Sequence, residues 1–151
     1  ATSYDQPALG GVYKLAAIQD EHGEWQPRIK LSEQAIKTSN PGKLQVRRYL
    51  NVDGQLECSQ LYNEFQGEPS RQLVTTTGTH NVVKGAIHHE ELLVPVIQSG
   101  KAVYQNPSLM DSRKRAMQNF DLYSQRNWEG GFGSSPELDT QKNELIEKNK
   151  R

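Results

Sequence analysis

The sequence has little apolar material for its length. Hydrophobic residues make up 34% and aromatic residues 7% of its 151 residues, whereas ordinary soluble domains are close to half apolar. A chain of this length fits one domain. The composition therefore predicts either long irregular surface segments or a core that another domain or subunit completes.

An excess of one charge and long hydrophobic runs are also missing. Lys and Arg together number 18, as do Asp and Glu, so the formal net charge is zero. A neutral chain lacks the basic footprint of proteins that bind nucleic acid or anionic membranes, and the three basic residues at 113–115 are too few to supply one. No apolar run approaches the roughly 20 residues of a membrane-spanning helix. We expect neither a nucleic-acid nor a membrane partner.

One cysteine, Cys58, excludes an internal disulfide bond. This favours a reducing compartment, and we expect a cytoplasmic protein. No signal peptide is visible. Because the chain begins at Ala1 and not at a Met, we expect further sequence upstream of it. A Cys/His hydrolase is the remote alternative, because Cys58 falls within an expected strand and has no nucleophile elbow around it. A buried structural thiol is favoured.

Metal-binding patterns are absent as well. His80, His88 and His89 fall close together, but no C-x-x-C, H-x-x-x-H or H-E-x-x-H pattern occurs. In an extended chain, neighbouring His88 and His89 point to opposite sides. We therefore expect surface or loop histidines and no metal site.

Alternating apolar residues and turn signals predict three β-hairpins in the first two thirds of the chain. Asp53-Gly54 between two alternating runs is the strongest of these signals. Pro27 and Pro95 place their strands at an edge or a bulge. The expected pairs are 12–18 with 25–31, 44–50 with 56–62, and 92–97 with 102–104; weaker strands are expected at 73–77 and 82–83, and a loop at 63–70.

Two helices are expected to follow. Asn106-Pro107-Ser108 is typical of a helix start, and an amphipathic helix is expected from there to about Arg126. Residues 128–135 are rich in glycine but lack the G-K-[ST] of a phosphate loop, so they predict a flexible linker. A last helix is expected at 136–149. The predicted fold class is α+β, mostly antiparallel hairpins followed by two C-terminal helices.

Two polar segments have the chemistry to approach a phosphate. The first precedes the Gly10-Gly11 step, where the backbone can bend sharply and admit another surface. The second is the turn at 37–43, whose backbone N–H groups and two ammonium groups suit an anion. The alternative is a plain solvated loop, because lysine-flanked Asn-Pro-Gly turns are common loop chemistry. The candidate phosphate-proximal residues are Ser3, Asp5, Gln6, Gly10, Gly11, Lys14, Lys37 and Lys43.

Three sequence blocks, at 5–15, 27–33 and 37–43, occur in an order and spacing that match a known family. The first resembles the segment after the phosphate-binding turn of nicotinate phosphoribosyltransferases, and the other two resemble the next landmarks of that family. Residues 92–97 and 104–107 look like its late hairpin and helix start, and the last helix matches loosely. The resemblance covers nearly the whole chain.

The resemblance implies that the chain is the C-terminal part of an enzyme of NAD biosynthesis. That enzyme forms nicotinate mononucleotide from nicotinate and phosphoribosyl pyrophosphate with ATP hydrolysis and Mg²⁺, and works as a dimer or larger assembly. No cofactor is expected to bind this segment. The family's phosphorylatable histidine, its nicotinate-binding arginine and serine and its Gly-Thr phosphate turn have no counterpart here. The chain alone is therefore expected to be inactive, with no catalytic residue of its own.

The resemblance also implies how the chain is divided. Residues 1–18 would leave an α/β barrel and enter the first strand, 19–105 would form a β-rich accessory domain, and 106–151 would form a helical segment containing the linker at 128–135. A freestanding β-rich binding or assembly module that completes a split enzyme is the alternative. Barrel strands encoded upstream of Ala1 would favour the enzyme fragment, and a start codon directly before Ala1 the module.

Overall fold

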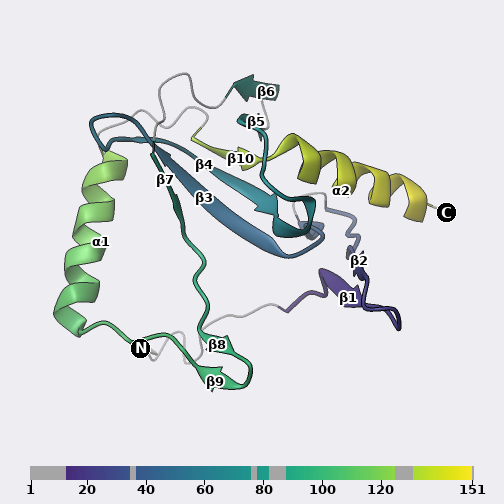
Figure 1. Cartoon of the computed structure of the whole chain (residues 1–151). Coiled ribbons are helices and arrows are strands. Elements are labelled where there is room, and N and C mark those ends of the chain that lie inside the picture. Colours follow the sequence, from purple (N-terminus) through teal and green to yellow (C-terminus); the bar gives the residue numbers. More distant parts are fainter. Residues whose placement is uncertain (1–12, 35–36, 76–77, 82–87, 125–130, 151) are drawn as a thin grey trace, which may run out of the picture.

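A six-stranded sheet forms the centre of the chain (Figure 1). The computed structural model describes residues 13–34, 37–75, 78–81, 88–124 and 131–150. The strands of this sheet are β3 (Leu44–Leu50), β4 (Leu56–Asn63), β5 (Gln72–Thr75), β6 (Gly78–Asn81), β7 (His88–Glu91) and β10 (Phe132–Ser134). They lie in the order β6-β5-β10-β4-β3-β7, and all neighbours are antiparallel except β10 and β4, which are parallel.

The central hairpin of β3 and β4 forms as the sequence predicts. In its turn, the Asn51 side-chain oxygen accepts hydrogen bonds from the backbone N–H groups of Asp53 (3.0 Å) and Gln55 (2.9 Å). Gly54 has a φ of 72°, a conformation that glycine adopts without steric cost. The Asp-Gly signal therefore fixed both the turn and the register of the two longest strands.

Alternation along β3 sorts its side chains onto two faces of the sheet. Gln45, Arg47 and Tyr49 share one face, which the loop after β4 crosses, because Arg47 bonds to Glu68 in that loop. Arg48 lies on the other face and donates a 2.8 Å hydrogen bond to Asn119 of the first helix. The sheet is thus covered by a loop on one side and contacted by a helix on the other.

Two small antiparallel pairs stand apart from the main sheet (Figure 1). One pairs β1 (Ala17–Gln19) with β2 (Trp25–Pro27), and the other pairs β8 (Ile97–Gln98) with β9 (Lys101–Ala102). Ser99 and Gly100 have φ angles of 49° and 73°, as a two-residue type I′ turn requires. The first and third predicted hairpins therefore exist, but with shorter strands than expected.

The prediction of a strand at 92–97 is wrong for residues 92–96, because only Ile97 of this segment belongs to a strand. The Gln45 side chain accepts a 2.9 Å hydrogen bond from the Leu93 N–H and donates one of 2.9 Å to the Leu93 carbonyl. Because these bonds satisfy the backbone of Leu93, no partner strand is needed there. The strand expected at 25–31 ends at Pro27, and the one expected at 12–18 begins at Ala17, with residue 12 outside the described residues.

Other strand predictions have mixed outcomes. The loop expected at 63–70 is confirmed apart from the end of β4 and a single turn, η2 (Glu64–Gln66). β5 confirms most of the strand expected at 73–77, while its last two residues and the strand expected at 82–83 lie outside the described residues. β6 and the polar β7 were not predicted.

Both predicted helices form, as α1 (Leu109–Ser124) and α2 (Pro136–Asn149). Ser108 caps α1 by accepting a 3.1 Å hydrogen bond from the Asp111 N–H. Ser135 caps α2 by accepting one of 3.2 Å from the Leu138 N–H, with Pro136 at the first helical position. The predicted α+β class is confirmed. Residues 125 and 126, where the first helix was expected to end, lie outside the described residues.

The glycine-rich linker expected at 128–135 is corrected at its second half. Phe132–Ser134 form β10, which is inserted between β4 and β5 in the middle of the sheet. A Cβ atom on Gly133 would overlap the Val74 carbonyl oxygen and lie 2.7 Å from Leu73 Cγ. Glycine is there because the neighbouring strand approaches closely, which is the opposite of a flexible link. Residues 125–130 lie outside the described residues.

The interior of the described part is small and half polar. Its buried apolar residues are Tyr49, Leu56, Cys58, Tyr62, Leu73 and Leu138, and its buried polar residues are Gln45, Arg47, Arg48, Ser59, Gln60, Asn63 and Ser135. The low apolar content of the sequence is thus reflected in a core held together by hydrogen bonds as much as by packing.

Candidate functional site

Three of the predicted phosphate-proximal residues lie in the described part of the chain. The Lys14 ammonium group donates a hydrogen bond to the Lys37 carbonyl oxygen, so these two residues are brought together. Lys43 instead forms an ion pair with Glu64, with Nζ 2.7 Å from the carboxylate. The others, Ser3, Asp5, Gln6, Gly10 and Gly11, lie outside the described residues. The role of these eight residues stays a prediction.

The predicted phosphate turn is built into the fold. The Gly42 N–H donates a 2.8 Å hydrogen bond to the Ala16 carbonyl, and the Lys43 N–H donates one of 3.0 Å to the Asn63 side chain. Gly42 is buried and has a φ of 93°. These two N–H groups already have acceptors, so they are not available to an anion.

Asn63 connects this turn to the end of β4 and to α2. Its side-chain oxygen also accepts a 3.1 Å hydrogen bond from the Phe65 N–H, and its amide nitrogen donates one of 3.0 Å to Gln141 of α2. Nearby, Lys142 donates a 2.9 Å hydrogen bond to the Asn40 side chain. The turn, the end of β4 and α2 therefore form one connected unit.

An open groove of about 440 Å³ lies beside this unit. Its polar end is formed by Lys43, Glu64 and Gln45, and its apolar side by residues of the segment 93–98. The paired charges of Lys43 and Glu64 leave no excess positive charge there. The groove suits a ligand or chain segment of mixed polarity better than a phosphate.

The densest network of charges surrounds Arg47, whose side chain is only 7% exposed. Its guanidinium group donates two hydrogen bonds to Glu68 in bidentate fashion and one of 2.6 Å, from Nε, to Glu91. The Tyr62 hydroxyl donates a 3.1 Å hydrogen bond to the same Glu91 oxygen, and Arg47 lies 5.1 Å from the centre of the Tyr62 ring. This cluster ties β3, β4, β7 and the loop after β4 together.

Contacts within the cluster contribute to shifts in the pKa values of Arg47 and Tyr62. Burial lowers the pKa of Arg47, but its hydrogen bonds to Glu68 and Glu91 outweigh burial and raise it above the ordinary value. Burial, followed by the hydrogen bond to Glu91, raises the pKa of Tyr62 to about 12. At neutral pH the arginine is therefore charged and the tyrosine neutral, which suits a structural tie better than a proton-transfer site.

The stabilisation that the Arg47 cluster provides depends on pH through Glu68. Hydrogen bonds from Arg47 lower the pKa of Glu68. In the unfolded chain the pKa of a glutamate is about 4.3. Because the pKa of Glu68 is lower in the folded protein, its ionised carboxylate stabilises the fold at pH values above the unfolded-state pKa. This stabilisation is lost as the pH falls through the folded-state pKa.

Glu68→Gln is expected to flatten the acid side of the stability profile. At pH 7 the loss should be about 1 kcal/mol or less, because the carboxylate is largely exposed. Urea unfolding at pH 3, 5 and 7 measures the profile. Glu144→Gln, which removes an exposed carboxylate of α2, is the control. If the free energy of unfolding changed between pH 3 and pH 7 by the same amount in Glu68→Gln as in the unsubstituted protein, Glu68 would not be the source of this pH dependence.

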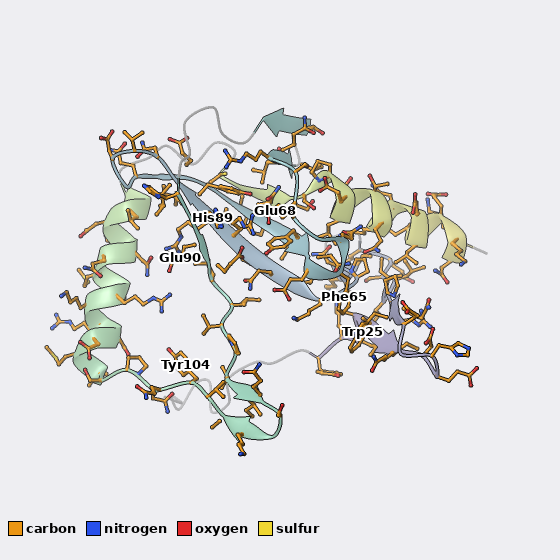
Figure 2. All side chains as sticks on the ribbon, viewed as in Figure 1. Trp25, Phe65, Glu68, His89, Glu90 and Tyr104 are labelled. Atoms are coloured by element: carbon orange, nitrogen blue, oxygen red, sulfur yellow. The ribbon has the colours of Figure 1, made fainter. Side chains whose placement is uncertain are left out.

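A second ionic contact joins β7 to α1 on the opposite face. Glu90 lies 3.4 Å from Arg48 and 3.7 Å from Arg115 of the helix, measured between carboxylate oxygens and guanidinium nitrogens. Figure 2 shows Glu90 directed from β7 toward α1.

At the other end of the sheet, Trp25 of β2 stacks on Phe65 at 5.0 Å between ring centres (Figure 2), which attaches the first hairpin to the loop after β4.

Sequence reasoning missed Arg47, Glu68 and Glu91 as a cluster. The available signal was an arginine at an inward position of an alternating strand, where an apolar residue is usual. Its two carboxylate partners are 21 and 44 residues away along the chain, so their meeting depends on topology that local patterns do not specify.

The described residues bear on three other predictions. Cys58 is a buried thiol, as expected, and His88 and His89 are exposed; the side chain of His80 is not described. Among the described residues, no group of three or more His, Cys, Asp or Glu side chains is arranged to hold a metal ion. The same residues include no helix with the length and apolar character needed to cross a membrane.

Comparison with known proteins gives one consistent answer, although no family model matches the chain. The nicotinate phosphoribosyltransferase of Bacillus subtilis is 31% identical over 127 residues, which are 80% of this chain and 26% of that protein. The mouse enzyme of that name is 37% identical over 122 residues, 78% of this chain and 22% of that protein. The chain thus spans about a quarter of the length of these relatives.

The fold agrees with these relatives. The crystal structure of human nicotinic acid phosphoribosyltransferase matches with a TM-score of 0.62 and 24% identity, covering 92% of this chain and 27% of that one. The fold is therefore that of one segment of a larger transferase. Over the matched part the chain resembles the C-terminal part of nicotinate phosphoribosyltransferases, which confirms the predicted resemblance.

Proposed function

We propose that this chain forms the C-terminal accessory lobe of a nicotinate phosphoribosyltransferase. The observation that carries the proposal is the 31–37% identity to relatives of that name over about four fifths of the chain. The chain corresponds to only about a quarter of those relatives, so the proposal assigns the reaction to the complete polypeptide. This lobe would support the remainder, a barrel that contains the catalytic groups.

In this proposal the complete protein is a cytoplasmic dimer. It transfers a phosphoribosyl group from phosphoribosyl pyrophosphate to nicotinate, with ATP hydrolysis and Mg²⁺. Within the lobe, Lys14 and Lys37 are the described candidates for phosphate contact, because the Lys14 ammonium group bonds the Lys37 carbonyl and brings the two residues together. The Arg47 cluster is a structural tie, since its charges are already paired with one another.

The test compares the complete gene product that contains these 151 residues with the 151-residue chain at equal concentration. Nicotinate mononucleotide formation is measured from nicotinate, phosphoribosyl pyrophosphate, ATP and Mg²⁺, with nicotinamide in place of nicotinate as the control. We expect turnover with nicotinate by the complete product and none by the chain.

Each other outcome contradicts part of the proposal. An inactive complete product, folded and supplied with all substrates, would refute the assignment to this reaction. Turnover by the 151-residue chain would refute the accessory role of the lobe. Activity that appears only after mixing with a separately encoded subunit would favour the freestanding module.

A further inference from the structure

Helix α1 contacts the sheet with its polar side. Asn119 accepts a hydrogen bond from Arg48, and Arg115 pairs with Glu90. Successive helical residues are about 100° apart, which puts Leu109, Met117 and Phe120 on another side of the helix, away from these contacts. Their exposed fractions are 84%, 54% and 67%. The amphipathic helix thus turns its apolar stripe away from its own sheet.

The segment that leads to α1 is exposed in the same way. Every residue from 93 to 118 is exposed, including Val94 and Ile97. We call residues 93–120 the arm. It is nevertheless ordered by the type I′ turn of β8 and β9 and by the Ser108 cap of α1. Figure 1 shows it running from β7 through β8 and β9 and back along α1.

An ordered arm with so many exposed apolar residues is expected to be buried against another surface in the functional protein. Helices in proteins owe most of their stability to packing of the apolar face, and monomeric proteins rarely leave large contiguous apolar patches open to water. The sheet does not cover the stripe, because Arg115 and Asn119, which contact the sheet, lie on a different side of α1 from Leu109, Met117 and Phe120. The cover must come from outside the described residues.

We propose that the arm packs against the portion of the same polypeptide that the relatives carry in addition to this lobe. The matched relatives are about four times as long as the segment they share with this chain, and in the human structure the fold makes up 27% of the chain. A covalently attached partner is present at high effective concentration. The inference rests on the proposed function in one respect, that the lobe is part of such a longer transferase.

The stripe also indicates the chemistry of the covering surface. Arg113 is four residues after Leu109 and four before Met117, so it lies within the apolar stripe. A buried guanidinium group needs acceptors. The covering surface is therefore apolar and offers a carboxylate or backbone carbonyl to Arg113.

Methionine oxidation tests the cover directly, because both methionines of the sequence, Met110 and Met117, lie on α1. The complete gene product is treated with hydrogen peroxide, which oxidises the methionine thioether to the sulfoxide, and the oxidation rate of each methionine is compared with that of the same protein in guanidinium chloride. We expect Met117 to be oxidised at least about tenfold more slowly in the folded protein. A rate within twofold of the unfolded protein would overturn the proposal.

Matched variants and isotope labels sharpen the result. Phe120→Asp on the stripe should restore fast oxidation of Met117, whereas Gln118→Asp on the polar side should not; equal effects would overturn the proposal. Protein assembled from ¹⁴N and ¹⁵N subunits is then cross-linked through Lys101 and Lys114. If only single-isotope cross-links form, the arm contacts its own polypeptide. Mixed cross-links in the share expected for random pairing of the two isotopes would show a second copy and overturn the proposal.

The same samples are assayed for nicotinate mononucleotide. Protection of Met117 without turnover leaves this inference standing and counts against the proposed function. Turnover without protection overturns this inference alone.

Discussion

Gly42→Ala is expected to lower the free energy of unfolding by about 4 kcal/mol, the largest effect among the substitutions considered. Two costs combine. A φ of 93° is unfavourable for a residue with a side chain, and an added Cβ would overlap the buried Asn63 amide. Moving Asn63 breaks its hydrogen bonds to Lys43, Phe65 and Gln141. Urea unfolding followed by circular dichroism measures the change.

Gly54→Ala is the matched control, because Gly54 also has a positive φ, of 72°, but has no atom within 4 Å of an added Cβ. It should cost only about 1 kcal/mol. The double variant Gly42→Ala/Asn63→Ala should be no less stable than Gly42→Ala alone, since the clash has been removed. Equal losses for Gly42→Ala and Gly54→Ala would show that the contact with Asn63 is unimportant.

Arg47→Met is expected to cost about 3 kcal/mol at pH 7, because it leaves the Glu91 carboxylate next to buried Tyr62 without its cation. Glu68 is mostly exposed and can return to water. Arg47→Lys keeps the charge but loses the bidentate geometry, and should cost about 1–2 kcal/mol. Unfolding in urea again measures both.

A double-mutant cycle separates lost packing from the stranded charge. Arg47→Met/Glu91→Gln should recover about 1 kcal/mol relative to Arg47→Met, because the unpaired carboxylate has been neutralised. Strict additivity of the two single losses would mean that Arg47 and Glu91 do not interact in solution, and the proposed tie between β3 and β7 would have to be abandoned.

Local signals in the sequence were sufficient where the structure itself is local. Asp53-Gly54 specified the β3–β4 hairpin, and Asn106-Pro107-Ser108 specified the start of α1, which Ser108 caps. Each of these features is set by residues within a few positions of one another, so its energy is present in the local chain.

The parts that could not be predicted depend on distant partners. Phe132–Ser134 have the composition of a linker, and become a strand because Ser59 to Leu61 and Val74 supply the hydrogen-bonding edges. For the candidate site, the sequence located the 37–43 turn, but the use of its N–H groups depends on Ala16 and Asn63. At Leu93, within the segment expected to be a strand, the side chain of Gln45 takes the place of a partner strand by bonding both backbone groups.

The place of β10 in the sheet has a consequence for how the protein is made. On the ribosome, β3, β4, β5 and β7 emerge well before residues 132–134, yet the backbones of β4 and β5 are paired only through β10, which lies between them. Until that strand leaves the exit tunnel, the sheet is two separate pieces, β6-β5 and β4-β3-β7, with open edges that invite aggregation. A chain released before residue 131 would lack the strand that pairs with both β4 and β5, so the six-stranded sheet can be completed only after β10 has been synthesised.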